Sequence, residues 1–181
     1  MKITTKQLAQ TALLLAICIA SQFFKGISPL ITGPIINICL ILCALVVGIP
    51  ASILLGVITP VTSYLISGSP AFPLLIPGIM LGNIVIGVVV GLVAGKKAGA
   101  ARLAIGLVIG SVCKAAVMGI VIVMIMLPMV TANLPAEKKA VMLPTLQYNF
   151  SALQLITALI ASAIVFIIWT PLKKALKADA E

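Results

Sequence analysis

The sequence has no histidine and only three acidic residues, Glu137, Asp179 and Glu181, in a chain of 181 residues. Charged residues make up 8% of the chain, whereas a soluble domain carries about a quarter. None of the four cysteines belongs to a C-x-x-C pair, and without histidine partners we expect no zinc site. The chain also lacks a Walker sequence and any Ser/His or paired-carboxylate arrangement, which argues against an enzyme.

Apolar residues dominate instead, at 62% of the chain with a mean hydropathy of +1.34. Continuous apolar runs recur, each long enough to cross a hydrocarbon core of about 30 Å as a helix. We therefore expect an all-α integral membrane protein, a bundle of six transmembrane helices that forms a single domain over residues 1–181. The expected helices cover residues 8–24, 35–47, 51–66, 74–94, 103–127 and 149–169. Loops are expected over 25–34 and 128–148, the second with a short surface helix from Pro135.

The basic residues predict the orientation of these helices. They gather in short clusters between the apolar runs, as topology signals do. With six crossings, eight basic residues fall on one side and three on the other, so the positive-inside rule places both the N- and C-termini in the cytoplasm. The eight are Lys2, Lys6, Lys96, Lys97, Arg102, Lys173, Lys174 and Lys177, and the three are Lys25, Lys138 and Lys139. Trp169 is then expected at the cytoplasmic interface, with Phe23, Phe24 and Tyr148 at the outer one.

Lys114 is the one basic residue near the middle of an expected helix. A lysine at the bilayer centre costs about 2.5–3.5 kcal/mol on insertion scales, and no acid lies inside an expected helix to pair with it. Gly110 and Ser111 lie one turn earlier and leave room beside the ammonium. One interpretation is a functional lysine that faces a cavity. The other is a lysine near a helix end that snorkels to the headgroups.

Other polar side chains gather in the expected outer half of the bundle. They are Thr59, Thr62, Ser63, Tyr64 and Ser67 in the third helix, Asn83 in the fourth, Asn37 at the start of the second, and Gln147, Ser151, Gln154 and Thr157 in the last. A single Thr or Ser of this kind is typical of hydrogen bonds that tie helices together. The whole set, taken with Lys114, favours a polar pocket open to the outside.

Small residues repeat at four-residue spacing in two of the expected helices. Ala12, Ala16 and Ala20 lie in the first, and Gly87, Gly91 and Gly95 in the fourth. This spacing lets two helices approach closely. For the glycines we expect packing inside the bundle, while for the alanines the docking of a partner helix competes with internal packing.

The chain resembles the substrate-binding S component of an energy-coupling factor (ECF) transporter. The resemblance lies in the size, the six helices, the AxxxA pattern of Ala12, Ala16 and Ala20, the stretch TGPIINICLILCALVVGIPASILLGVITPVTSYLISG at 32–68, and LQLITALIASAI at 153–164. It implies a protein of the bacterial or archaeal cytoplasmic membrane that binds a vitamin or similar micronutrient from outside. It also implies a separate membrane T component, which would dock on the alanine face, and two ATPases. ATP would be used by these partners, and no cofactor is expected in this chain.

The resemblance also places the substrate pocket in the outer half, under the first loop. Carried over by position, Asn83, Lys114, Asn149 and Gln154 would be its polar contacts, and the polar face of the third helix adds Thr59 and Tyr64. Because a buried lysine suits a carboxylate, a phosphate or a polarised carbonyl, we hypothesise that Lys114 contacts an anionic or carbonyl-rich substrate. The leading alternative is a small secondary carrier or facilitator that works alone. A third possibility is a structural or regulatory membrane subunit that binds no ligand.

Overall fold

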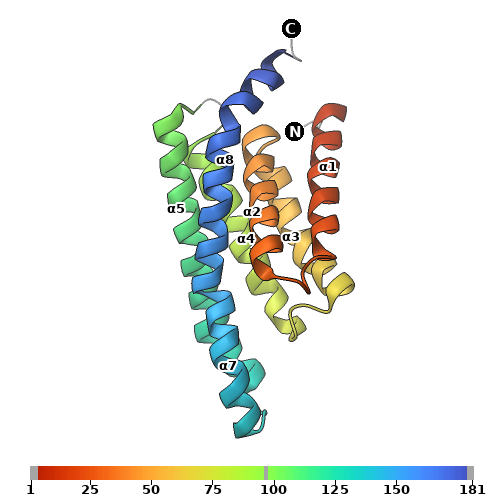
Figure 1. Ribbon diagram of the computed structural model, residues 1–181, viewed down its shortest axis with the longest axis vertical. Coiled ribbons are helices and arrows are strands. Elements are labelled where there is room, and N and C mark those ends of the chain that lie inside the picture. Colours follow the sequence, from red (N-terminus) through yellow and green to blue (C-terminus); the bar gives the residue numbers. More distant parts are fainter. Residues whose placement is uncertain (1–3, 96–97, 179–181) are drawn as a thin grey trace.

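The computed structural model describes residues 4–95 and 98–178, and every regular element within these ranges is a helix (Figure 1). The elements are α1 (Thr5–Gln22), α2 (Pro29–Val46), α3 (Ile49–Ser67), the short 3₁₀ helix η1 (Pro73–Leu75), α4 (Ile76–Val93), α5 (Ala100–Met118), the π-helical η2 (Gly119–Met126), α6 (Leu127–Thr131), α7 (Ala136–Phe150) and α8 (Ala152–Ala178). Of the residues discussed above, Lys2, Lys96, Lys97, Asp179 and Glu181 lie outside the described ranges.

Five helical stretches of the described chain are long and apolar enough to cross a membrane: Pro29–Val46, Ile49–Ser67, Pro73–Val93, Ala100–Thr131 and Ala136–Ala175. This confirms the prediction of an all-α, multi-pass membrane protein. Helix α1 is not among the five, because Lys6, Gln7 and Gln10 lower the hydropathy of its first half. The sixth crossing and the cytoplasmic termini remain predictions.

Helix α2 begins earlier than predicted. Its first residue is Pro29 rather than residue 35, so the connection from α1 is short. The side chain of Ser28 accepts a hydrogen bond from the backbone N–H of Leu30 and caps the helix. Pro29 fits the first position, where the backbone N–H has no helical partner in any case. At the other end, Gly48 adopts a φ of +140° that side-chain-bearing residues rarely adopt, which allows the tight turn into α3.

The predicted loop over residues 128–148 is wrong, because nearly all of it is helical. Helix α5 continues through η2 and α6 to Thr131, and the chain returns as α7 from Ala136. Pro135 does precede a helix, but that helix has 15 residues and runs on to Phe150. The resulting hairpin extends beyond the ends of α1–α4 (Figure 1). Pro128 and Pro144 are accommodated within helical backbone, so these prolines did not mark loop structure as the sequence suggested.

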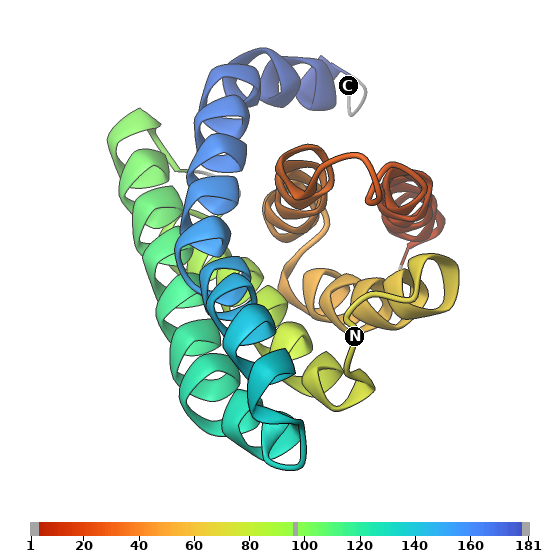
Figure 2. The ribbon, with the colours of Figure 1, turned by 60° about the horizontal axis from the view of Figure 1, so that its bottom comes forward.

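Helix α2 has a central position and packs against α1, α3, α4 and α8. Helix α1 packs mainly on α2 and α3, and so lies at the edge of the bundle. Seen from the hairpin end, α1–α3 lie on one side and the long α5 and α8 on the other, with α4 between them (Figure 2). Both described chain ends lie at the end of the bundle opposite the hairpin (Figure 1).

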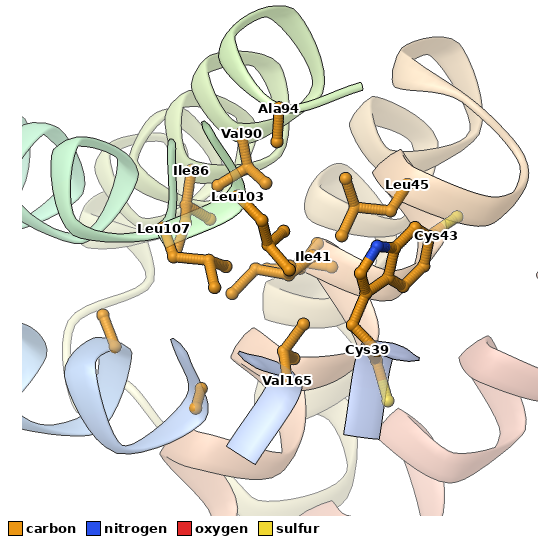
Figure 3. Packing of buried hydrophobic residues seen from close by; sticks show 14 of the residues in the cluster. Cys39, Ile41, Cys43, Leu45, Ile86, Val90, Ala94, Leu103, Leu107 and Val165 are labelled. Carbon is orange, nitrogen blue, oxygen red and sulfur yellow. The ribbon is translucent and has the colours of Figure 1, made fainter. Parts of the chain in front are cut away.

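The main apolar core fills the half of the bundle nearest the chain ends. Ile41 and Leu45 of α2 meet Leu103 of α5 and Val165 of α8 there (Figure 3). Trp169 belongs to this core and is only 4% exposed. The indole therefore packs among helices instead of facing lipid, and the level of Trp169 relative to the cytoplasmic membrane surface stays a prediction.

Two of the three repeated glycines of α4, Gly87 and Gly91, serve close helix packing, as predicted. A Cβ on Gly87 would collide with the side chain of Ser52, and one on Gly91 would lie 2.5 Å from a carbon of Ile49. These glycines let α3 approach α4 closely. Gly95 differs, because its φ of +64° places it in the left-handed conformation that ends the helix.

Candidate functional site

A polar cavity lies in the half of the bundle that faces away from the described chain ends. It is lined by the α1–α2 connection, the first half of α2, the second half of α3, the start of α4, the end of α5 and the start of α8. The cavity volume is about 170 Å³, which is enough for a compact organic molecule rather than a single water. The bundle is thus divided into an apolar half and a half with a polar interior, as the distribution of polar residues predicted.

Lys114 lies at the buried end of this cavity and is 3% exposed. Its Nζ donates to Oδ1 of Asn37 at 2.6 Å and to Oδ1 of Asn83 at 2.8 Å. These contacts tie α5 to α2 and α4, and they exclude the interpretation that the lysine snorkels to the headgroups. An ammonium has three N–H donors, so one N–H remains free for a ligand after Lys114 has donated to both asparagines.

The ammonium fixes the orientation of the two asparagine side chains. Lysine can only donate, so Asn37 and Asn83 must turn their amide oxygens toward it. The Asn83 Nδ2 then donates to Oγ1 of Thr59 at 3.3 Å. The hydroxyl proton of Thr59 and the Nδ2 of Asn37 have no further hydrogen-bond partner among the described residues. The buried end of the cavity therefore offers three kinds of donor to a ligand: one N–H of Lys114, the amide N–H groups of Asn37 and the hydroxyl of Thr59.

A second lysine, Lys25, lines the cavity from the α1–α2 connection. Its Nζ donates to Oγ of Ser63 on α3, and that hydroxyl donates in turn to the backbone carbonyl of Ser69 at 3.1 Å. Lys25 is half-buried, and this burial lowers the pKa of its ammonium from 10.5 to about 8. From the sequence, Lys25 is predicted only as one of the loop charges, because nothing in the local sequence indicates that its side chain turns inward.

The α8 side of the cavity adds both apolar and polar groups. The Nε2 of Gln154 donates to the backbone carbonyl of Asn149 at 3.0 Å, which leaves its Oε1 as an acceptor in the cavity wall. Thr157 is buried beside Gly33 of α2, where an added Cβ would lie 2.8 Å from the threonine methyl. This close approach of α2 and α8 closes one side of the cavity.

Five of the six predicted contact residues line the cavity: Thr59, Asn83, Lys114, Asn149 and Gln154. Tyr64 does not line it and is half-buried elsewhere on α3. With about 100° between successive helical residues, Tyr64 points well away from the direction shared by Thr59 and Ser63. Asn37 and Lys25 are the functional candidates that the sequence analysis did not select. Asn37 was noted among the polar residues, and its position one turn after Gly33 was the signal available.

The three alanines of α1 lie outside this cavity, on an open face of the bundle. Ala12, Ala16 and Ala20 are all exposed in the described chain. Leu13 and Ile17 continue the same exposed surface, at 63% and 42%. Internal packing therefore does not explain the alanine spacing, and the surface is free to meet lipid or another helix.

The fold and the cavity together define a multi-pass helical membrane protein with a polar site buried inside its bundle. Comparison with protein families then identifies which kind: a family model for the substrate-specific component of ECF transporters matches residues 6–172. The chain belongs to this family, and the resemblance drawn from its sequence is confirmed. Searches of the curated proteins and of the solved structures gave no match.

Proposed function

We propose that this chain captures a vitamin-like micronutrient from outside the cell and delivers it to an ATP-driven importer. The observation that carries the proposal is the donor cluster around Lys114 at the buried end of the cavity, because such a group in a membrane needs a partner to offset its burial. The site residues are Lys114, Asn83, Asn37 and Thr59 at the buried end and Lys25 at the mouth. Family membership supports a transport role for this site.

In the proposed orientation, six helices cross the prokaryotic cytoplasmic membrane and both termini are cytoplasmic. The cavity then opens to the outside, where the α1–α2 connection lies over it. The surplus of basic residues at the chain ends supports this orientation.

We further propose that the exposed face of α1 is the surface on which a T component docks. Its alanines allow the close approach that small residues give between membrane helices. No acid lines the cavity within the described residues, so the bundle offers no carboxylate for an ion-coupled cycle of its own. Energy would instead come from two ATPases attached to the T component.

Purification from native membranes in mild detergent tests the proposal. We expect a second membrane subunit and two ATPases to accompany the chain, and uptake in proteoliposomes to require all of them together with ATP. Uptake by the isolated chain would contradict the proposal and favour a stand-alone carrier. A chain that neither binds a small molecule nor supports uptake would indicate a structural or regulatory subunit.

A further inference from the structure

The cavity contains two lysines and, within the described residues, no acid that lines it. Of the three acids in the chain, only Glu137 is described, and it is exposed at the start of α7. Ammonium groups held in a membrane interior are costly unless an opposite charge or several hydrogen bonds compensate them. The described part of the protein supplies neutral amide and hydroxyl oxygens to both lysines but no carboxylate in the cavity wall, so a negatively charged ligand would neutralise them.

The buried end of the cavity is matched to an anionic group. Because Asn37 and Asn83 turn their oxygens toward Lys114, the ammonium, the Asn37 amide N–H groups and the Thr59 hydroxyl are the donors left to meet a ligand. A carboxylate or phosphate accepts several hydrogen bonds at once, whereas a cationic amine would be repelled by the Lys114 ammonium. The same cluster would therefore reject a cationic group.

Lys25 holds a second, separate position on the wall of α3. It contacts Ser63, whereas the Lys114 cluster reaches α3 at Thr59 through Asn83. These two positions are one helical turn apart, or about 6 Å along the axis. A single carboxylate is too small to take short hydrogen bonds at both levels. Burial already lowers the pKa of Lys25, and an anion beside it would restore the charge.

We infer that the cavity takes a compact molecule with two separated anionic groups, one held by the donor cluster around Lys114 and the other by Lys25. This inference rests on the proposed function, since it names the substrate class of the same cavity. The small volume of the cavity favours a short molecule, and the Oε1 of Gln154 offers an acceptor to a donor between the two ends. A monoanion would leave Lys25 without a charged partner.

The test uses α,ω-dicarboxylates from succinate to pimelate, the monocarboxylates of equal chain length, and the matching α,ω-diamines. The readout is the thermal-unfolding midpoint of the purified full chain, from which apparent dissociation constants follow by mass action. We expect one or two dicarboxylates to bind about 10- to 100-fold more tightly than their monocarboxylate partners, as one charged hydrogen-bonded contact allows. The diamines should give no shift.

Lys25→Met should remove this preference while monocarboxylate binding at the buried end persists, which also shows that the variant is folded. Lys138→Met, an equal loss of charge on the exposed α7, should keep the preference. Equal binding of mono- and dicarboxylates, no shift with any of these acids, or a preference that survives in Lys25→Met would each overturn the inference. Any of these results would leave co-purification with the transport partners and ATP-dependent uptake intact, and so would not by itself contradict the proposed function.

Discussion

Replacing Lys114 with methionine separates a ligand-binding role of this lysine from a purely structural one. The side chain ties together α2, α4 and α5 through Asn37 and Asn83, so a structural role is a real competitor. Methionine keeps most of the length and removes the charge and the donors. A structural tie would show itself mainly in stability, whereas a ligand contact would show itself mainly in affinity.

The structure gives a magnitude for each effect. Loss of two charged hydrogen bonds of 2.6 and 2.8 Å removes about 3–6 kcal/mol of stabilisation, at about 1.5–3 kcal/mol each. Removing an ammonium from the membrane interior returns about 2.5–3.5 kcal/mol. These two contributions oppose each other, so the net change in folding free energy should lie between a gain of about 0.5 and a loss of about 3.5 kcal/mol. The ligand loses one charged hydrogen bond, which corresponds to an affinity about 10- to 100-fold lower.

The assay measures the thermal midpoint of wild type, Lys114→Met and Lys138→Met in detergent, without ligand and with the best-binding dicarboxylate. Lys138 is exposed on α7, so its variant controls for the loss of one positive charge. We expect a modest change in the unliganded midpoint of Lys114→Met and an almost complete loss of its ligand-induced shift. An unchanged ligand-induced shift, with or without a large loss of stability, would refute the assignment of Lys114 to the binding site.

Three further predictions concern other parts of the molecule. Tryptophan at both Ala12 and Ala16 should abolish ATP-dependent uptake and T-component co-purification but spare ligand binding; loss of binding would instead indicate a role in the bundle itself. Dicarboxylate affinity, measured between pH 7 and 9, should fall about tenfold as Lys25, with a pKa of about 8, loses its charge. Lys25→Arg should remove this part of the pH dependence, because arginine stays charged over this range. A wild-type affinity that does not change with pH would contradict the prediction. Gly87→Val should lower the free energy of unfolding by about 1–3 kcal/mol, measured by thermal unfolding, because there is no space for a side chain. Gly119→Val is the control: nothing lies within 4 Å of its added Cβ, so it should change the free energy of unfolding by less than about 1 kcal/mol. Equal effects of the two variants would show that α4 can shift to make room.

Two residues at the buried end of the cavity, Lys114 and Asn83, were predictable because each is an exception in its own segment. Lys114 is a charge within an apolar run, and Asn83 is the strongest hydrogen-bonding side chain of its helix. Such groups need partners in a membrane, so their convergence follows from the cost of leaving them alone. Lys25 could not be selected in the same way, because a lysine in a connection is satisfied by water unless the tertiary structure turns it inward.

The helix boundaries in the second half of the chain could not be predicted from the sequence either. Three prolines between residues 128 and 144 suggested a long loop, yet each is accommodated in or beside a helix. Proline disrupts a helix because its ring clashes with the preceding turn and because it has no backbone N–H to donate. An irregular stretch such as η2 changes the hydrogen-bond pattern of that preceding turn, so a proline after it can be accommodated. The burial of Trp169 could not be predicted from the sequence either, because the packing of the neighbouring helices decides whether a side chain faces the core or the lipid.

In the proposed orientation, the long hairpin gives this membrane protein a surface that large molecules in the surrounding water can reach. The stretch from Ala100 to Thr131 has 32 residues, or about 48 Å of helix, against about 30 Å of hydrocarbon. In the proposed orientation its tip stands outside the cell, on the same helix α7 that carries Asn149 and Phe150 to the cavity. If the chain has the proposed orientation and function, we expect an antibody fragment bound to this tip to shield the approach to the cavity and to reduce ligand capture without entering the lipid.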